Sequence, residues 1–438
     1  MAAASTSDSR FRLTDDQAQL LADRFGTPLY VVDEAHFRAR IRRYRAAFRA
    51  ARPKSELTFA SKANSTLALL AIAAQEGCMI DVASEGELRA ALAAGVPAGR
   101  CHLHGNNKSE GELRFAIASG INQIVVDNFG EIESLVRAGA LEAKTELVLR
   151  LAPGVDPKTH AKISTGQADT KFGFNIADGS AERALLRCLE LGLNVVGVHC
   201  HVGSQLLDPE AQISGGELIA QFAVEMKSRH GFVSEVINVG GGLGVRYLDE
   251  DRPMDVEDYC RLVVEAVEKA LDGSGLDPLL VQEPGRSLIA ESGLTLYRVG
   301  VRKTVPSREK GERTYLCVDG GLADNPRPAL YGSRYAVAPT AVGREGGARE
   351  LAPFTISGRH CETDRLFEDV MLPCDLREGD LLQVLCTGAY NSSMASNYNR
   401  YRRPATVLIR GSGEPVLVQR PETWEEMFAR EILPEDFR

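Results

Sequence analysis

One alternation, repeated from about residue 55 to residue 290, constrains the fold of this chain more than any other feature. A short apolar run rich in β-branched residues is followed each time by a longer stretch rich in Ala, Leu and Glu. Eight such runs lie at 57–60, 79–83, 101–104, 124–127, 146–151, 195–201, 236–239 and 279–283, with helical stretches such as 66–76, 85–94, 109–119 and 129–138 between them. Strands that alternate with helices form parallel sheets, and eight such units can close into a barrel. The sequence therefore predicts an α/β fold with a (β/α)8 barrel.

The chain after residue 292 has a different pattern. Strand-like runs at 294–299, 315–318, 381–385, 405–409 and 415–419 are separated by turns rich in Gly and Pro, with little helical periodicity. The run 29–32 near the N-terminus has the same character. We therefore expect a barrel over residues 33–291 and a mostly antiparallel β-domain formed by residues 1–32 together with 292–438.

Composition excludes several classes of partner. The net charge of −9 argues against general affinity for nucleic acids or anionic membranes. No apolar run reaches the roughly 18 residues that a membrane-spanning helix needs, and the Ala- and Ser-rich N-terminus lacks the features of a signal peptide. The nine cysteines are scattered and contain no CxxC pair, which favours a reducing cytoplasm over a disulfide framework. We expect a cytoplasmic protein that acts on a small molecule.

Reactive side chains collect where the predicted strands end. The carboxyl ends of barrel strands form the face that carries active sites in this fold. The residues at these ends are Lys62, Asp81, Asn106, Arg150, His201, Ser204, Gly240, Gly241, Gly242, Glu283 and Arg286. Together they offer an amine nucleophile, a flat ring, a glycine turn that can bind phosphate, and a carboxylate. This set predicts a phosphorylated cofactor that reacts with an amine.

Pyridoxal phosphate meets this description. Its aldehyde forms a Schiff base with a lysine amine, for which Lys62 is the candidate. Its phosphate needs unobstructed backbone N–H groups, which the glycines at 240–242 can supply. Its pyridine nitrogen needs a carboxylate, and Glu283 is a candidate, while His201 can stack on the ring. Taken singly, such a lysine is usually a surface residue and such a glycine run is often a tight turn, so the combination carries the prediction.

Two histidine pairs suggest an alternative. His102 with His104, and His199 with His201, are spaced so that both members of a pair face one side of a strand. Such pairs can bind metal ions in barrel hydrolases. Because no further carboxylate or histidine completes a ligand set in the sequence, we expect no metal.

Seven motifs in register resemble those of the fold-type III pyridoxal-phosphate decarboxylases, whose barrel is of the alanine racemase type. They are FASKAN at 59–64, DVASEGEL at 81–88, HVGSQ at 201–205, GGGLG at 240–244, EPGRS at 283–287, Cys361 with Glu362, and GAY at 388–390. The resemblance extends from about residue 25 to residue 420. Within this family the chain is most similar to the diaminopimelate decarboxylases, on the strings ISTG at 163–166, KFG at 171–173 and NPRPALY at 325–331.

The resemblance implies a complete site. Catalysis would rest on Lys62, Cys361 and Glu283. The cofactor would be held by Lys62, Asp81, His201, Ser204, Gly241, Gly242, Glu283, Gly285, Arg286 and Tyr390. The substrate would be held by Arg286, Arg327, Tyr331, Glu362 and Tyr390. The implied reaction is decarboxylation of meso-2,6-diaminopimelate to L-lysine and CO2, the last step of lysine biosynthesis.

The implied roles divide between two subunits of a homodimer. Glu283 would keep the pyridine nitrogen protonated, and Cys361 of the partner subunit would act as general acid after CO2 leaves. Arg286 and Arg327 would hold the distal carboxylate of the substrate by bidentate pairing, and Glu362 would hold its distal ammonium. The β-domain would thus complete the active site and contribute to the dimer interface.

Two departures from the family pattern bear on the substrate. The family usually reads Cys-Glu-Ser-Gly-Asp where this chain reads CETD at 361–364, one residue shorter, and Phe59 stands where Tyr is commoner. Rival functions are decarboxylation of ornithine, arginine or carboxynorspermidine on the same fold, racemisation, or a non-catalytic regulatory role. Regulatory homologues tend to lose the lysine or the cysteine, and this chain has both Lys62 and Cys361. Arg327 has its own alternative, a surface salt bridge that only fixes its loop.

Overall fold

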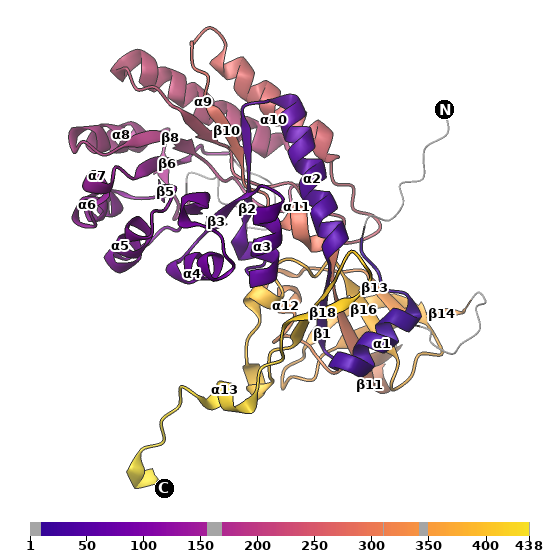
Figure 1. Ribbon diagram of the computed structural model, residues 1–438. Coiled ribbons are helices and arrows are strands. Elements are labelled where there is room, and N and C mark those ends of the chain that lie inside the picture. The colour runs from indigo at the N-terminus through magenta and orange to yellow at the C-terminus, as the bar shows by residue number, and fades with distance from the viewer. Residues whose placement is uncertain (1–9, 156–168, 310, 341–348, 438) are drawn as a thin grey trace, which may run out of the picture. The chain divides into compact units, whose positions relative to one another are not determined.

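The computed structural model describes residues 10–155, 169–309, 311–340 and 349–437. The chain divides into two compact units (Figure 1). The barrel unit comprises residues 38–245 and 251–288, and the β unit comprises residues 1–37, 246–250 and 289–438. The ISTG string at 163–166, on which part of the resemblance rests, lies outside the described residues.

Eight parallel strands form the barrel. They are β2 (Ser55–Ala60), β3 (Met79–Val82), β4 (Cys101–Leu103), β5 (Gln123–Val126), β6 (Glu146–Ala152), β8 (Val195–His199), β9 (Val236–Asn238) and β10 (Leu279–Gln282). Each strand pairs with its neighbours, and the pairings of β10 with β2 and of β5 with β6 close the sheet on itself. A short strand, β7 (Phe174–Asn175), extends the pairing of β6. The predicted (β/α)8 barrel and all eight of its strands are confirmed.

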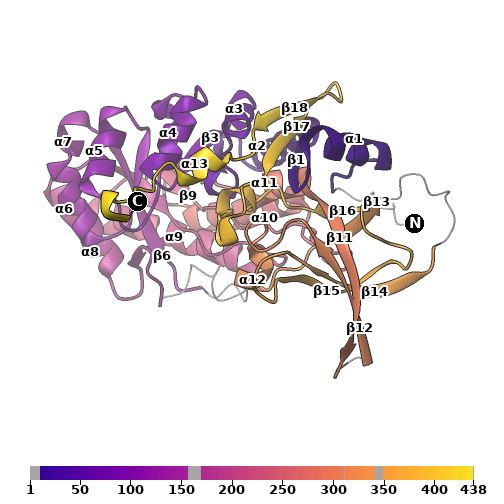
Figure 2. The same cartoon turned by 90° about the horizontal axis from the view of Figure 1, so that it is seen from below.

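Helices surround these strands, as both views show (Figures 1 and 2). They are α2 (Glu34–Ala51), α3 (Leu67–Gln75), α4 (Glu85–Ala93), α5 (Glu110–Ala118), α6 (Phe129–Arg137), α7 (Ala140–Ala143), α8 (Ser180–Glu190), α9 (Glu210–His230), α10 (Val256–Leu271) and α11 (Arg286–Ile289). Three successive helices begin alike, because Ser84, Ser109 and Asn128 each accept a hydrogen bond from a backbone N–H in the first turn. These caps end the preceding loops at defined residues, so the loops that follow β3, β4 and β5 are short.

The barrel is filled and closely packed. Val125, Val148, Val196, Val236 and Val281, from five neighbouring strands, form one buried cluster. Branched side chains of this kind fill the layers inside such barrels. Neighbouring strands approach closely at Gly197, where a Cβ would lie 2.1 Å from the carbonyl oxygen of Val236. The packed interior leaves the strand ends as the place for a site.

The β unit contains a second, mixed sheet. Its strands are β1 (Leu29–Asp33), β11 (Gly293–Ser307), β12 (Gly311–Val318), β13 (Val337–Thr340), β14 (Leu351–Ser357), β15 (Arg365–Pro373), β16 (Leu381–Leu385), β17 (Ala405–Ile409) and β18 (Pro415–Gln419). Most pairings are antiparallel, whereas β1 with β17 and β12 with β14 are parallel. Figure 2 shows β11 and β12 as a long two-stranded ribbon. The predicted mostly antiparallel sheet is confirmed.

Three strands of this sheet were not predicted from the sequence. Pro339, a residue that is rare inside strands, lies within β13, and a register irregularity follows Phe354 in β14. In β15, Asp369 has a φ of +55°, which breaks the alternation of buried and exposed residues. Strands of this kind lack the period of two that reveals a strand in sequence.

Three short helices complete the β unit: α1 (Asp15–Phe25), α12 (Arg327–Tyr331) and α13 (Trp424–Phe428). No helix within the described residues is both long enough and apolar enough to cross a membrane.

Candidate active site

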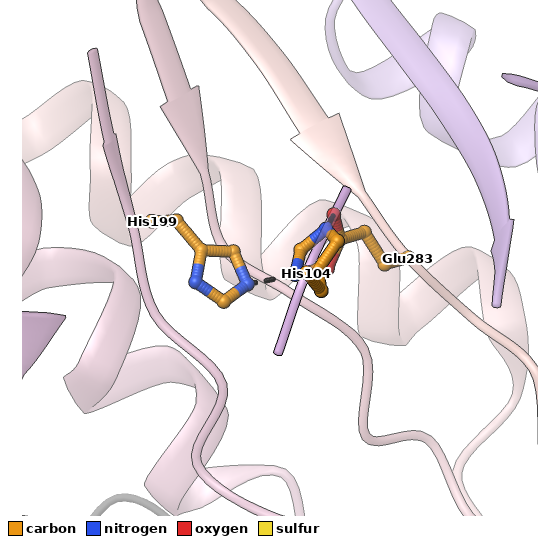
Figure 3. A group of neighbouring side chains, drawn as sticks. All are labelled: His104, His199 and Glu283. Atoms are coloured by element: carbon orange, nitrogen blue, oxygen red, sulfur yellow. Dashed lines mark hydrogen bonds and ion pairs between the residues drawn. The ribbon is translucent and has the colours of Figure 1, made fainter. Parts of the chain in front are cut away.

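Glu283 is the centre of the polar cluster at the strand ends of the barrel unit. It follows β10 and is buried. Its Oε1 accepts a hydrogen bond of 2.6 Å from Asn238 Nδ2, at the end of β9, and lies 2.9 Å from His104 Nε2. Its Oε2 lies 3.2 Å from His199 Nε2, at the end of β8 (Figure 3). Because Oε2 has this one partner among the described residues, it keeps a lone pair for a further donor.

This cluster holds a negative charge in a buried place. Burial by itself raises the pKa of the Glu283 carboxyl, but the two histidines beside it lower that pKa well below its usual value. Burial lowers the pKa of His199 to about 4, so this imidazole is neutral near pH 7 and donates from Nε2. Glu283 is therefore ionised at neutral pH and can hold a proton on the nitrogen of a bound ring.

The same three side chains also form a group of metal-ligand type. One ligand atom from each of His104, His199 and Glu283 lies within 4.8 Å of the others. The expectation that no carboxylate completes a histidine set was wrong on this point, because barrel closure brings the ends of β4, β8 and β10 together. His199 Nε2 is hydrogen-bonded to the carboxylate and His104 Nε2 lies 2.9 Å from it, so both rings contact the anion directly, whereas a bound cation needs lone pairs directed at a shared centre. That the site holds no metal stays a prediction.

Lys62 lies in a single 3₁₀ turn, Ser61–Ala63, directly after β2. Its Nζ is 3.6 Å from Oδ2 of Asp81, whose side chain is 1% exposed against 40% for that of Lys62. Neither carboxylate oxygen of Asp81 accepts a hydrogen bond among the described residues. The amine is thus accessible to a small molecule, and a buried carboxylate holds it beside the Glu283 cluster.

His201 and the glycine run form the next part of the site. Burial, with the neighbouring charge of Lys62, lowers the pKa of His201 well below its usual value, so the ring is neutral and can stack. The N–H of Gly241 donates to His201 Nδ1 at 3.4 Å. Gly240 has a φ of +71°, and a Cβ on Gly241 would lie 2.3 Å from the carbonyl oxygen of Glu283. Only glycine lets this backbone pass between the ends of β8 and β10.

Arg286 and Ser204 supply polar groups beside that turn. Arg286 is buried, and its Nε donates to Ser204 Oγ at 3.1 Å. A Cβ on Gly285 would lie 2.9 Å from the Cβ of Ala63, so this glycine lets the start of α11 pack against the Lys62 turn. An amine, a neutral ring, a charged carboxylate, a glycine turn and a guanidinium therefore lie at one end of the barrel, as pyridoxal phosphate requires.

Arg150 and Asn106, also at strand ends, have other partners. The Arg150 guanidinium is buried, lies 4.1 Å from the ring centre of Phe172, and is 3.7 Å from the Asp127 carboxylate. The carbonyl oxygen of Asn106 accepts a hydrogen bond of 3.0 Å from Asn128 Nδ2. These contacts fix loops at the strand ends.

The remaining predicted residues belong to the β unit. Arg327 begins α12 and is buried, with its guanidinium 5.2 Å from the ring centre of Tyr331 and 5.6 Å from that of Tyr390. It donates to Ser333 Oγ at 3.3 Å, and no carboxylate of the described residues forms an ion pair with it. The alternative role for Arg327, a surface salt bridge that fixes its loop, is therefore wrong: the side chain is buried and has no ion-pair partner among the described residues. A buried guanidinium framed by aromatic rings is suited to a carboxylate ligand.

Cys361 and Glu362 lie on the exposed loop between β14 and β15. The Cys361 N–H donates to Asn399 Oδ1 at 2.9 Å, and Glu362 Oε1 accepts a 2.5 Å hydrogen bond from the Tyr398 hydroxyl. In the β unit, Arg327 thus lies beside Tyr331 and Tyr390, while Cys361 and Glu362 share a separate loop. That these residues form one site with those of the barrel unit stays a prediction.

Sequence reasoning missed the partners of these residues. His104 and His199 were considered only as metal ligands, and Asn238, Tyr398 and Asn399 were not considered. The position of both histidines at strand ends was a usable signal for a role beside Glu283. No local pattern indicates the contact between Tyr398 and Glu362.

Comparison with known proteins agrees with this geometry. Residues 34–290 match the family model described as pyridoxal-dependent decarboxylase, pyridoxal binding domain. The chain is 45% identical to diaminopimelate decarboxylase of Bacillus subtilis over 94% of this chain and 92% of that relative. It is 45% identical to diaminopimelate decarboxylase of Actinosynnema pretiosum over 94% of this chain and 90% of that relative.

Solved structures agree in fold. Diaminopimelate decarboxylase of M. jannaschii in complex with L-lysine superposes with a TM-score of 0.88 at 34% identity, covering 99% of this chain and 98% of that one. The enzyme of Helicobacter pylori complexed with L-lysine gives 0.84 at 30% identity, covering 94% and 98%. This chain therefore belongs to the pyridoxal-dependent decarboxylase family, among the relatives of the diaminopimelate decarboxylases.

Proposed function

We propose that this protein decarboxylates meso-2,6-diaminopimelate to L-lysine and CO2, with pyridoxal phosphate as its cofactor. The observation that carries the chemistry is the buried, ionised Glu283 at the same end of the barrel as Lys62. The names of the relatives, which are 37–45% identical over more than nine-tenths of this chain, support the choice of substrate.

The barrel residues prepare the site for this chemistry. Pyridoxal phosphate supplies an aldehyde that joins to an amine and a ring that takes up the electrons left when CO2 departs. Lys62 offers the amine that anchors it. Glu283 would hold a proton on the ring nitrogen of the bound cofactor, and the neutral His201 would pack against its ring. Arg286, Ser204 and the backbone of Gly241 and Gly242 would bind its phosphate.

The residues of the β unit select the substrate and finish the reaction. Arg327, with Tyr331, holds the carboxylate at the far end of the substrate, and Glu362 holds the far ammonium. Cys361 Sγ gives the proton that replaces the departing carboxylate. Tyr390 and Arg286 contribute to both the phosphate and the substrate ends. The buried guanidinium of Arg327 supports this assignment, since a substrate whose far end is only cationic gives it no partner.

We further propose that the active protein is a homodimer in which the Cys361 loop serves the barrel of the partner subunit, and that it works in the cytoplasm. The Cys361 loop lies far in the sequence from Lys62 and Glu283 and belongs to the other unit of the fold, which suits a site shared between two subunits. Nine cysteines that form no disulfide suit a reducing compartment.

A substrate panel tests the proposal. Purified protein is incubated separately with meso-diaminopimelate, L-ornithine, L-arginine and carboxynorspermidine, and CO2 and the amine product are measured. We expect the highest specificity constant for meso-diaminopimelate, whereas preference for ornithine or arginine would replace the proposed substrate. Borohydride should fix the cofactor to the peptide that contains Lys62. Protein that gains no absorption with added pyridoxal phosphate would contradict the whole assignment.

A further inference from the structure

The loop that carries Cys361 and Glu362 is closed at its base by a buried pair. The Asp364 carboxylate accepts hydrogen bonds from the His360 ring (2.6 Å), the His360 N–H (3.1 Å) and the Leu322 N–H (2.9 Å). The side chains of His360 and Asp364 are 1% and 2% exposed. The His360–Asp364 contact thus joins the two ends of the CETD segment at 361–364, and Cys361 and Glu362 lie exposed at the tip of the loop.

Two glycines make room for that pair. A Cβ on Gly358 would lie 2.0 Å from Oδ2 of Asp364, and a Cβ on Gly321 would lie 2.3 Å from the same atom. No larger residue at either position is compatible with the closed loop. The base of the loop is therefore fixed by packing, and its tip needs a separate support.

A strained turn supplies that support. Asn399 and Arg400 have φ angles of +51° and +59°, so two successive non-glycine residues occupy the left-handed region. A non-glycine residue in this region raises the free energy of the folded state. Such backbone strain is found mostly at functional sites, where it fixes the direction of a side chain. Asn397 Nδ2 donates to the carbonyl oxygen of Tyr401 at 3.1 Å and holds the turn closed.

The turn directs two neighbouring side chains at the loop tip. Asn399 Oδ1 accepts from the Cys361 N–H, and the Tyr398 hydroxyl donates to Glu362 Oε1. The Tyr398 ring also stacks on the His360 ring, with centres 5.9 Å apart and planes at 19°. Tyr398 is thus held between the base of the loop and the side chain it contacts.

We propose that Tyr398 is a specificity-positioning residue, which holds the Glu362 carboxylate so that its second oxygen faces the distal ammonium of the substrate. This inference rests on the proposed function. Glu362 is exposed, so without a fixed partner its side chain samples many rotamers. Among the described residues Oε2 has no hydrogen-bond partner, which leaves it for an ammonium. Among the described residues the Tyr398 hydroxyl donates its hydrogen bond to Glu362, which fits a role in orienting that carboxylate.

The kinetic test is the substitution Tyr398→Phe, which removes one hydroxyl and keeps the ring stacked on His360. We expect KM for meso-diaminopimelate to rise about 3- to 10-fold with kcat almost unchanged, since only the ordering of one side chain is lost. The matched control is Tyr401→Phe, in the same turn. The Tyr401 ring also packs on His360, but its hydroxyl contacts the Arg359 carbonyl at 3.4 Å. The control should leave KM unchanged.

A double-mutant cycle separates positioning from a structural role. On a Glu362→Gln background, Tyr398→Phe should have little further effect, because both substitutions act on one contact. Additive effects of the two substitutions, or equal effects of Tyr398→Phe and Tyr401→Phe, would overturn the proposal.

A measurement without substrate keeps this inference separate from the proposed function. The hydrogen bond to Glu362 raises the pKa of the Tyr398 phenol. Subtracting the ultraviolet titration of Tyr398→Phe from that of the holoenzyme isolates this phenol, and Glu362→Gln should lower its pKa. If the protein releases no CO2 from diaminopimelate, the proposed function fails, while an unchanged phenol titration refutes the contact itself.

Discussion

The substitution Glu283→Gln removes one negative charge from the site and keeps the shape of the side chain. The new amide places a donor where Glu283 has an acceptor, so one neighbour has to accept a hydrogen bond. His199 can do so, because its Nδ1 has no hydrogen-bond partner among the described residues and the ring proton can move there from Nε2. The change of tautomer leaves Nε2 free to accept. We therefore expect the variant to fold and to bind the cofactor.

The cost should fall on catalysis. Loss of a charged partner for the ring nitrogen removes about 2–4 kcal/mol of transition-state stabilisation, which corresponds to a fall in kcat of roughly 30- to 900-fold. Cofactor content should not change, because the proposed anchors are Lys62, Arg286 and the glycine turn. CO2 release per mole of bound cofactor gives kcat, and absorbance after release of the cofactor in alkali gives its content.

A control in the same unit separates this effect from the general loss of a carboxylate that is partly shielded from water. Glu56 lies near the amino end of β2, and burial raises the pKa of its carboxyl. Its neighbour His102, whose Nε2 is 3.8 Å away, is neutral near pH 7 because burial lowers its pKa to about 4. Glu56→Gln should leave kcat unchanged. A Glu283→Gln enzyme with full cofactor content and wild-type kcat would refute the assignment of Glu283 to the ring nitrogen.

Three further predictions address the shared site, the substrate and the buried histidines. Mixing inactive Lys62→Ala with inactive Cys361→Ala protein should restore partial CO2 release through hybrid dimers, and persistent inactivity after demonstrated subunit exchange would favour a site within one chain. Arg327→Ala should lower kcat/KM for diaminopimelate by about two to three orders of magnitude, with Arg327→Lys a poor rescue; an unchanged value would remove Arg327 from the substrate site. Burial lowers the pKa of His102 from 6.5 to about 4, so between these two pH values the unfolded chain binds more protons than the folded protein does. The free energy of unfolding should therefore decrease as the pH falls from 6.5 to about 4, by at most about 3 kcal/mol for this group. His102→Gln should flatten that slope in urea unfolding, and an equal slope in both proteins would disprove this account.

Much of the candidate site could be predicted because local pattern fixes where strands end. Lys62 and Glu283 lie at or just beyond the ends of apolar runs, and a barrel brings such positions to one face whatever the details of its packing. The glycines at 240–242 were also recognisable, since their turn lies between a strand and the next element. Each of these predictions used a few neighbouring residues and one general property of the fold.

The contacts that tune the site could not be predicted in this way. His104 and His199 reach Glu283 only because the closed barrel brings the ends of β4, β8 and β10 within a few ångströms. The contact between Tyr398 and Glu362 depends on two left-handed residues in a turn far along the chain from the loop. Such contacts are set by side-chain geometry and have no periodic signal in sequence.

The sequence by itself determined the alternation of strands and helices, the closed parallel barrel and the reactive residues at its carboxyl ends, because hydrophobic periodicity and capping act over a few residues. The tertiary structure alone decided which buried groups form hydrogen bonds and charge contacts with one another. It surrounded the Glu283 carboxylate with polar groups from three other strands, and it left the Arg327 guanidinium buried without a carboxylate partner among the described residues. The physical reason is that the pKa of a buried group depends on every charge and dipole within a few ångströms, and those neighbours come from distant parts of the chain.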